Sequence, residues 1–291
     1  MVTAAPVLSF AAVSGATSRI PVCLSIAGSD SGGGAGIQAD LKAFARAGVH
    51  GTTAITAITA QNTVAVTAVE AVSPAMIVAQ VRAVADDIGV DAVKIGMLGS
   101  VATAEAVSSA LDLLADGTPI VVDPVMVAES GARLLDRDAQ RALVDLVVAR
   151  ATVVTPNIPE ARVLAGDDSL DAEGLARAVQ ALGPQAVVVT GGHRDEATDV
   201  FFDGDSLRLI PGERHPDGAA HGSGCTHSSS LAAHLALGHD PLTAAEAAKR
   251  IAAEAVRNGL RGIGAGAGPV DVLGMTAAVA PPLTNARAAR V

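Results

Sequence analysis

The chain has 291 residues and half of them are hydrophobic, so it can build the large core of one α/β domain or of two smaller ones. Its 30 acidic residues outnumber the 20 basic ones, and the net charge of −10 argues against a nucleic-acid or membrane partner, although a local backbone site can still hold a phosphate. Only two cysteines are present, which excludes a disulfide framework and predicts a reducing, cytoplasmic location.

The two ends of the chain differ in character from the rest. Residues 1–19 are rich in alanine and serine and have no basic residue before Arg19, so we expect a flexible extension and not a secretory signal. Residues 276–291 lack apolar periodicity and are expected to form a flexible tail. Between them there is no linker, no repeat and no apolar run of about 18 residues, so residues 20–275 are predicted to form one domain.

Short apolar segments alternate with longer alanine-rich segments in this domain. Strands are expected at 21–27, 51–57, 92–95, 119–122, 152–155 and 186–190. Helices are expected at 34–47, 74–88, 101–115, 136–149, 170–182, 224–237 and 242–259. A hairpin with an Asp203-Gly204-Asp205 turn joins the segments 200–202 and 207–210. Continuously apolar strands are typical of a sheet covered on both faces, so the pattern predicts a three-layer αβα fold around a mostly parallel sheet.

Polar or glycine-rich segments follow six of the predicted strands. They begin at Gly28, Gln61, Gly96, Asp123, Pro156 and Gly191. The carboxyl ends of parallel strands meet at one edge of a sheet, and ligands of such folds bind there. We therefore expect these segments to outline a single site.

The segment from His221 to Thr226 has glycines at Gly222 and Gly224, directly before a predicted helix. Its backbone N–H groups, including that of Ser223, and the positive end of the helix would then converge on one point, which favours an anion-binding site. Cys225 lies inside this segment, and we expect the helix end to lower the pKa of its thiol. The alternative is an ordinary glycine-rich loop before a helix.

The glycine-rich segment 28–36 joins the first strand to the first helix. Residues 34–39 match G-x-G-x-x-A, but the second strand does not end in the acidic residue of a dinucleotide site, and no P-loop sequence occurs. The loop fits close approach of the backbone to a small substrate. Asp40, one turn into the helix, is either a charge on the helix surface or a substrate ligand.

Gln61 carries a primary amide just after the second strand. An amide both donates and accepts, so it can pair side-on with an aminopyrimidine or an adenine edge. The alternative is a turn amide that binds its own backbone.

Two carboxylates and one amide suggest a cation site. Asp123 ends an apolar strand, where a buried charge requires a partner such as a metal ion. Asn157 and Glu160 lie three positions apart at a helix start and could hold the waters of a Mg²⁺ ion. The same spacing is also that of a capping box, which would need no metal.

Together these segments resemble the hydroxymethylpyrimidine/phosphomethylpyrimidine kinases of thiamine biosynthesis, in the ribokinase-like superfamily. The resemblance spans about Val22 to Val270 and rests on AGSD (27–30), GGAGIQADL (33–41), TAQNT (59–63), KIGML (94–98), VDPV (122–125), TPN and PEA (155–157 and 159–161), TGGH (190–193) and HGSGCT (221–226). It implies a ribokinase-like kinase that uses ATP and Mg²⁺ and forms a homodimer.

The resemblance also implies roles for single residues. Gln61 would pair with the aminopyrimidine, with Gly28, Met97 and Asp40 among the substrate-binding residues. The segment from Gly222 to Cys225 would form the anion hole, with Cys225 at the position of the catalytic base. Further residues would hold Mg²⁺–ATP: Asn157, Glu160, Thr190 and Gly192 at the nucleotide, and Asp123 and Glu160 at the metal.

Two other functions remain open at the level of the sequence. A kinase for pyridoxal or pyridoxine, a related ring alcohol of the same superfamily, is the nearer one. A non-catalytic metabolite-binding protein that keeps the pocket is the other, and the presence of Asp123, Asn157, Glu160 and Cys225 argues against it.

Overall fold

The computed structural model describes residues 19–127, 135, 137–191, 197–216 and 218–276. Most of the expected N-terminal extension and nearly all of the expected tail lie outside these residues, as does Gly192. The proposed domain limits therefore stay a prediction. Among the described residues, no helix has both the length and the apolar character to cross a membrane.

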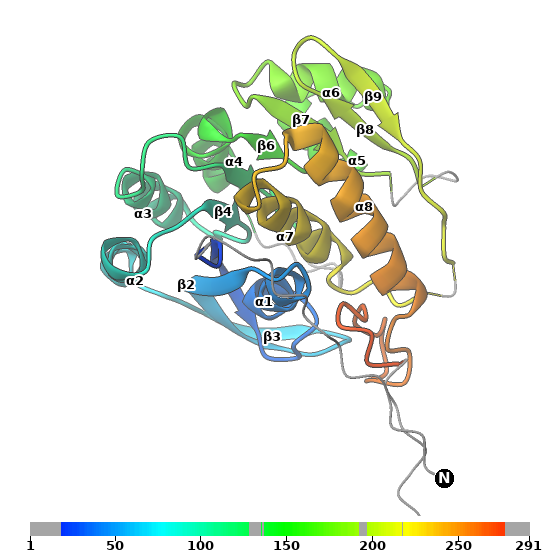
Figure 1. Cartoon of the computed structure of the whole chain (residues 1–291), viewed down its shortest axis with the longest axis horizontal. Helices are drawn as coiled ribbons and strands as arrows, with labels where there is room; N and C mark the ends of the chain where they lie inside the picture. Colours follow the sequence, from blue (N-terminus) through cyan, green and yellow to red (C-terminus); the bar gives the residue numbers. More distant parts are fainter. Residues whose placement is uncertain (1–18, 128–134, 136, 192–196, 217, 277–291) are drawn as a thin grey trace, which may run out of the picture.

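Within these residues, nine strands form one sheet in the order β3-β2-β1-β4-β5-β6-β7-β8-β9 (Figure 1). They are β1 (Val22–Asp30), β2 (His50–Gln61), β3 (Val66–Ala71), β4 (Ala92–Ile95), β5 (Ile120–Val122), β6 (Val153–Val154), β7 (Ala186–Val189), β8 (Asp199–Phe202) and β9 (Leu207–Ile210). The six central strands, in the order β2-β1-β4-β5-β6-β7, pair in parallel. The strands β3, at one edge, and β8 and β9, at the other, are antiparallel additions. This confirms the predicted mostly parallel sheet.

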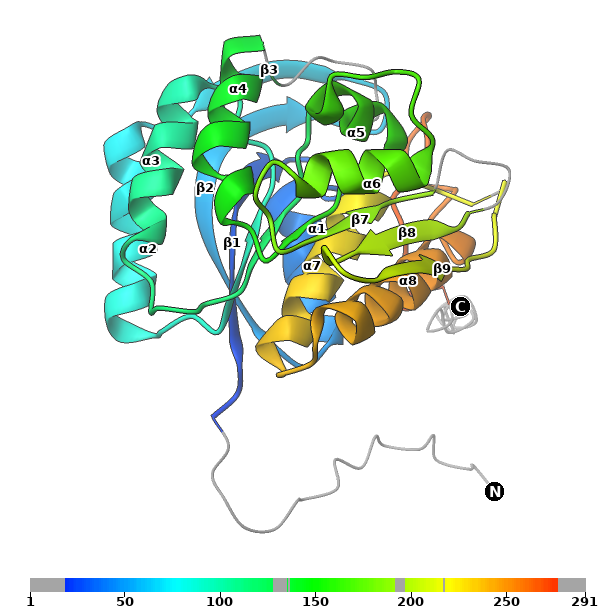
Figure 2. The ribbon, with the colours of Figure 1, turned by 90° about the horizontal axis from the view of Figure 1, so that it is seen from above.

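Helices cover both faces of the sheet, as the view from above shows (Figure 2). One face carries α1 (Gly36–Arg46), α7 (Ser223–Ala236) and α8 (Pro241–Arg257); the other carries α2 (Pro74–Asp87), α3 (Val101–Leu111), α4 (Arg137–Leu146), α5 (Ile158–Ala165) and α6 (Ala172–Gln180). Two separate apolar cores fill the spaces between the sheet and these layers. The predicted three-layer αβα architecture is confirmed.

Local sequence explains where several helices begin. Ser73, Ser100, Asp171 and Asp240 are N-caps whose side chains each accept a hydrogen bond from a backbone N–H of the first turn. Proline follows the cap directly in α2 and α8, where its missing N–H has no intrahelical partner to lose.

The strand β3 was not predicted, and its exposure explains why. Five of its six residues are exposed, so it lacks the alternation of apolar and polar residues that marks a half-buried strand. It pairs only with the end of β2, at the edge of the sheet. Both β1 and β2 extend past the predicted segments because their polar ends continue into the site.

Candidate active site

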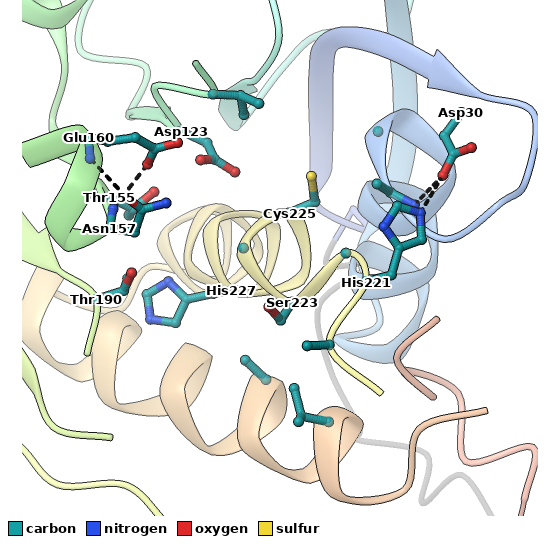
Figure 3. A pocket seen from close by; sticks show the side chains of 18 of the residues that line it. Asp30, Asp123, Thr155, Asn157, Glu160, Thr190, His221, Ser223, Cys225 and His227 are labelled. Atoms are coloured by element: carbon teal, nitrogen blue, oxygen red, sulfur yellow. Dashed lines mark hydrogen bonds and ion pairs between the residues drawn. The ribbon is translucent and has the colours of Figure 1, made fainter. Parts of the chain in front are cut away.

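A cavity of about 440 Å³ opens at the carboxyl ends of the central strands. Residues from five of the six polar or glycine-rich segments that follow the strands line it, together with Thr190 at the end of the sixth predicted strand, the start of α7 and one side of α8. Its volume is that of a site for small molecules. Figure 3 shows α7 entering the middle of the site, with Asp123 and Glu160 on one side and Asp30 on the other.

Asp30 organises the loop between β1 and α1. Its carboxylate accepts hydrogen bonds from the backbone N–H groups of Gly32, Gly34 and Ala35 at 2.8–3.1 Å. It also faces His221, whose Nε2 lies 3.0 Å from Asp30 Oδ2 (Figure 3). Burial opposes ionisation of Asp30, but these donors hold the pKa of the carboxyl below its usual value.

The loop before α7 touches the β1–α1 loop backbone to backbone. Gly222 has a φ of +85°, and a Cβ placed on it would lie 1.8 Å from the Gly34 carbonyl oxygen. Only glycine fits this position. At the start of α7, the Ser223 N–H donates to Ala220 O. The next two N–H groups, those of Gly224 and Cys225, have no intrahelical acceptor. This geometry suits an anion, as the sequence predicts.

The expected lowering of the Cys225 pKa is wrong. Burial raises the pKa of the thiol to about 12, and the charges of Asp123 and Asp40 add to the increase. Lys94 and the Gly36 N–H act in the opposite direction but do not outweigh burial. Cys225 does line the cavity, so its position is compatible with the predicted role while its protonation state is not.

Asp40 is not in reach of a ligand in the cavity, which corrects its assignment to the substrate. Its carboxylate is fully buried and pairs with Lys94 at 2.9 and 3.1 Å. The hydroxyls of Ser25 and Ser229 donate to the same carboxylate at 2.6 Å. Burial would lower the pKa of Lys94, but the charges of Asp40 and Asp123 raise it, so Lys94 is a cation beneath the cavity.

Asp123 and Glu160 bring two carboxylates to one wall of the cavity (Figure 3). Burial raises the pKa of both groups, and the charge of Asp123 helps to bring that of Glu160 to about 8. Asp123 accepts a hydrogen bond from Ser228 at 2.9 Å. Two repelling carboxylates facing a cavity are the donor set that Mg²⁺ uses when it binds a nucleotide, so the residues present fit this ion.

Glu160 and Asn157 also form the capping box of α5. Asn157 Oδ1 accepts from Glu160 N–H at 2.9 Å, and Glu160 Oε2 accepts from Asn157 N–H at 3.0 Å. The capping interpretation is thus confirmed, and the backbone of Met126 supplies a further hydrogen bond to the same carboxylate. One residue can serve both functions because a carboxylate has two oxygens.

A second charged cluster, which the sequence did not reveal, lies at the far end of the cavity. Asp199 Oδ1 accepts from Lys249 at 2.6 Å and from Gly191 N–H at 2.8 Å, and His227 Nε2 lies 3.3 Å from Asp199 Oδ2. The cluster ties β8 to α7 and α8. Lys249 could have been found, because it is a charge on the alanine-rich buried face of α8.

The remaining predicted residues lie at opposite ends of the same cavity. Gln61, Gly28 and Met97 line one end, and a Cβ on Gly28 would lie only 2.6 Å from Met97 Cε. Thr190 lines the other end, near Asn157 and His227 (Figure 3). The cavity therefore has two ends, with the start of α7 between them.

Comparisons with known proteins identify the family of the chain. The family model described as phosphomethylpyrimidine kinase matches residues 30–271. A hydroxymethylpyrimidine/phosphomethylpyrimidine kinase of Rhizobium meliloti is 50% identical over 257 residues, which cover 86% of this chain and 96% of the relative. The enzyme of that name from Synechococcus elongatus is 46% identical and covers 86% of this chain and 97% of its own length.

Solved structures share the fold. An ADP complex of Bacillus subtilis pyridoxal kinase has a TM-score of 0.80 and 36% identity, and the match covers 88% of this chain and 99% of that one. A phosphomethylpyrimidine kinase from Clostridium difficile has a TM-score of 0.71 and 38% identity, and the match covers 82% and 100% of the two chains. The matched family model extends over most of the described fold and over most of the residues that line the cavity, and on this basis the chain belongs to the phosphomethylpyrimidine kinase family.

Proposed function

We propose that this chain transfers the γ-phosphoryl group of ATP to 4-amino-5-hydroxymethyl-2-methylpyrimidine and then to its monophosphate. The observation that carries the proposal is the position of the anion-binding start of α7 between the Gln61 end of the cavity and the Asp123–Glu160 wall. A phosphoryl group held there lies between an alcohol and a nucleotide, as in-line transfer requires.

The two ends of the cavity divide the binding of the substrates. Gln61 pairs with the edge of the aminopyrimidine, while Gly28 and Met97 enclose the ring. Asn157 and Thr190 lie on the nucleotide side, and Gly192, which follows in the sequence, is assigned to the same side. Because the anion hole consists of backbone N–H groups, it stabilises the negative charge of the phosphoryl group without a side chain that must reorganise.

In the first step, an oxygen–phosphorus bond forms to the hydroxymethyl group while the bond between the γ-phosphorus and the β–γ bridging oxygen breaks. The alcohol proton passes to Cys225, whose thiolate must therefore be generated beforehand. Lys94 favours that thiolate, because its charge lowers the thiol pKa. Bound at Asp123 and Glu160, Mg²⁺ would neutralise phosphate charge and orient the nucleotide.

The second step requires less from the protein. The nucleophile is a phosphate oxygen whose second pKa is about 6, so it is already ionised at neutral pH. Cys225 then has no proton to accept, and the anion hole and the cation wall carry the step.

Pyridoxal is the second candidate substrate, because pyridoxal kinases share the fold with a TM-score of 0.80. The two candidates are separated by incubating the purified chain with ATP, Mg²⁺ and each ring alcohol, and resolving the products by mass. Mono- and diphosphate of the pyrimidine support the proposal. Turnover of pyridoxal alone overturns the substrate while keeping the kinase.

We further propose that the chain forms a homodimer through the exposed edge of its sheet. Ile58, Val64 and Val69 on β2, β3 and their connection are each more than half exposed. Exposed apolar side chains on an edge strand are typical of a surface that a second copy covers. Light scattering is expected to give twice the chain mass of 28.7 kDa, and Val69→Lys is expected to give the monomer. A wild-type monomer at micromolar concentration contradicts the proposal.

A further inference from the structure

Two polar contacts link the Gln61 side chain, through Thr59, to the backbone of β1. Thr59 Oγ1 lies 2.9 Å from the Ser29 carbonyl oxygen and 3.2 Å from Gln61 Oε1. Thr59 and Gln61 are two positions apart on β2, so their side chains leave the same face of the strand. Thr59 is only 5% exposed, whereas Gln61 is partly exposed, and both line the cavity. The threonine hydroxyl is therefore the buried support of the amide.

The number of protons available for hydrogen bonding limits which way the Gln61 amide can face Thr59. A threonine hydroxyl has a single proton to donate, and it accepts through its lone pairs. The Ser29 carbonyl can only accept, and it lies at a shift in the β1–β2 register, where the backbone ladder is interrupted. The Thr59 hydroxyl donates its proton to the Ser29 carbonyl oxygen, because that contact is the shorter of the two. If the amide oxygen of Gln61 faced Thr59, two acceptors would compete for one proton; if the amide nitrogen does, both contacts are hydrogen bonds.

We propose that Thr59 is a positioning residue that turns the Gln61 amide so that Nε2 donates to Thr59 and Oε1 is free to accept from the substrate. A rotation of 180° about the last side-chain bond leaves the shape of the amide unchanged, so hydrogen bonds alone choose the orientation. No other side-chain contact of Gln61 among the described residues competes with Thr59. The orientation of the recognition group is thereby set by its neighbour on the same face of β2.

This orientation determines which ring the site accepts, and the inference rests on the proposed function. An aminopyrimidine edge presents a donor, the exocyclic amine, beside an acceptor, the ring nitrogen. The analogue with a carbonyl oxygen in place of the amine presents an acceptor beside an N–H donor. An amide with a fixed orientation matches one arrangement of donor and acceptor on the ring edge and leaves unpaired groups with the other. An amide that rotates freely matches both. Thr59 thus makes the kinase selective for the amino compound.

The test compares kcat/KM for the amino substrate and for the oxo analogue. For the wild type we expect a ratio of roughly 10- to 100-fold in favour of the amino compound, the discrimination that one bidentate contact provides. Thr59→Val keeps the shape of the side chain but removes the hydroxyl, and the ratio is expected to approach one through faster turnover of the oxo analogue. Thr59→Ser restores the hydroxyl and is expected to restore the ratio.

Thr52→Val is the matched control. Thr52 lies on the same strand, is buried, and donates to the Cys23 carbonyl of β1 at 3.1 Å, but it does not line the cavity. Its loss should affect stability as Thr59→Val does and leave the ratio unchanged.

The outcomes separate the inference from the proposed function. A wild-type ratio near one, which needs no variant, overturns the inference, and so does an unchanged ratio in Thr59→Val. Turnover of neither pyrimidine by the wild type, with turnover of pyridoxal, overturns the proposed function and the inference together. A ratio that falls in Thr59→Val and returns in Thr59→Ser supports both.

Discussion

At the scale of single residues, the protonation state of the Cys225 thiol depends on the charges around it. Burial, Asp123 and Asp40 raise its pKa, and Lys94 lowers it, with a result of about 12. A neutral thiol cannot accept a proton, so a base at this position requires a change in the surrounding charge. A cation held by Asp123 and Glu160 would supply that change, because it cancels a negative charge that disfavours the thiolate.

Removing the thiol is expected to separate the two phosphorylations. Cys225→Ser should lower kcat of the first step by about 10²-fold or more, the usual contribution of a general base. The second step should lose less than about tenfold, since its nucleophile is already ionised. Single-turnover assays started from the alcohol and from the monophosphate measure the two losses separately. Equal losses in both steps would show that Cys225 does not act as a base.

The raised pKa itself can be measured by alkylation. A thiol with a pKa of about 12 is nearly all protonated at pH 7. As long as the pH is below the pKa, each rise of one pH unit increases the thiolate fraction about tenfold. Labelling of Cys225 by iodoacetamide should therefore rise about tenfold per unit from pH 7 to pH 10. Added Mg²⁺ should increase the rate at fixed pH, whereas fully buried Cys23 should stay unlabelled. A plateau below pH 9 contradicts the assigned protonation state.

At the scale of elements, the start of α5 combines a structural and an electrostatic task. The capping box needs an acceptor at residue 160, which glutamine also supplies, whereas the cation wall needs the negative charge of Glu160. The pKa of Glu160 is raised from 4.5 to about 8 by burial and by Asp123. The folded state thus binds this proton more tightly than the unfolded state, so ionisation of Glu160 removes stability as the pH rises from about 4.5 to 8.

Glu160→Gln is expected to keep the helix cap and remove the charge. In the absence of Mg²⁺, the melting temperature of the variant should match the wild type near pH 5 and exceed it by roughly 10 °C or more at pH 9, where the wild-type carboxylate is ionised. The same variant should lose most of its Mg²⁺-dependent affinity for ATP. Thermal melts in a chelator and nucleotide titrations with and without Mg²⁺ measure the two effects.

Glu160→Ala is the control for the cap. It removes the charge and the acceptor together, so it should melt below Glu160→Gln at every pH, by the amount that half a capping box contributes. If both variants melt below the wild type at pH 9, then the carboxylate is not destabilising and the cation-wall interpretation loses its basis.

At the scale of the whole molecule, the sequence predicted what local patterns can determine. Apolar periodicity identified the strands of the parallel sheet, and the polar segments after them converge on one cavity because parallel strands end at one edge. The strand β3 was missed because exposure removes its pattern. The helix start at Asn157 was recognised from its cap, but not the length of α5.

Contacts between distant segments could not be predicted in the same way. Asp40 looked like a helix-surface charge or a ligand, and only the fold shows that Lys94, 54 positions away, occupies its carboxylate. The pKa of Cys225 depends on those same groups and on burial, so the rule for helix starts gave the wrong direction. Pairings of this kind depend on the tertiary structure, and a single sequence contains no periodicity that marks them.

One further pairing of this kind joins the two halves of the site. Asp30 and His221 are 191 positions apart and hold the β1–α1 loop against the anion hole. His221→Leu keeps the bulk of the side chain but removes its donor, so the loops should lose their mutual alignment and kcat of both steps should fall by about 10-fold or more. His221→Gln retains a donor and should recover most of the rate. Because Asp30 acts partly through the same contact, Asp30→Asn should cause a smaller loss when it is added to His221→Leu than when it is made alone. Fully additive losses in the double variant would mean that the two residues act independently and that the site is aligned by other contacts.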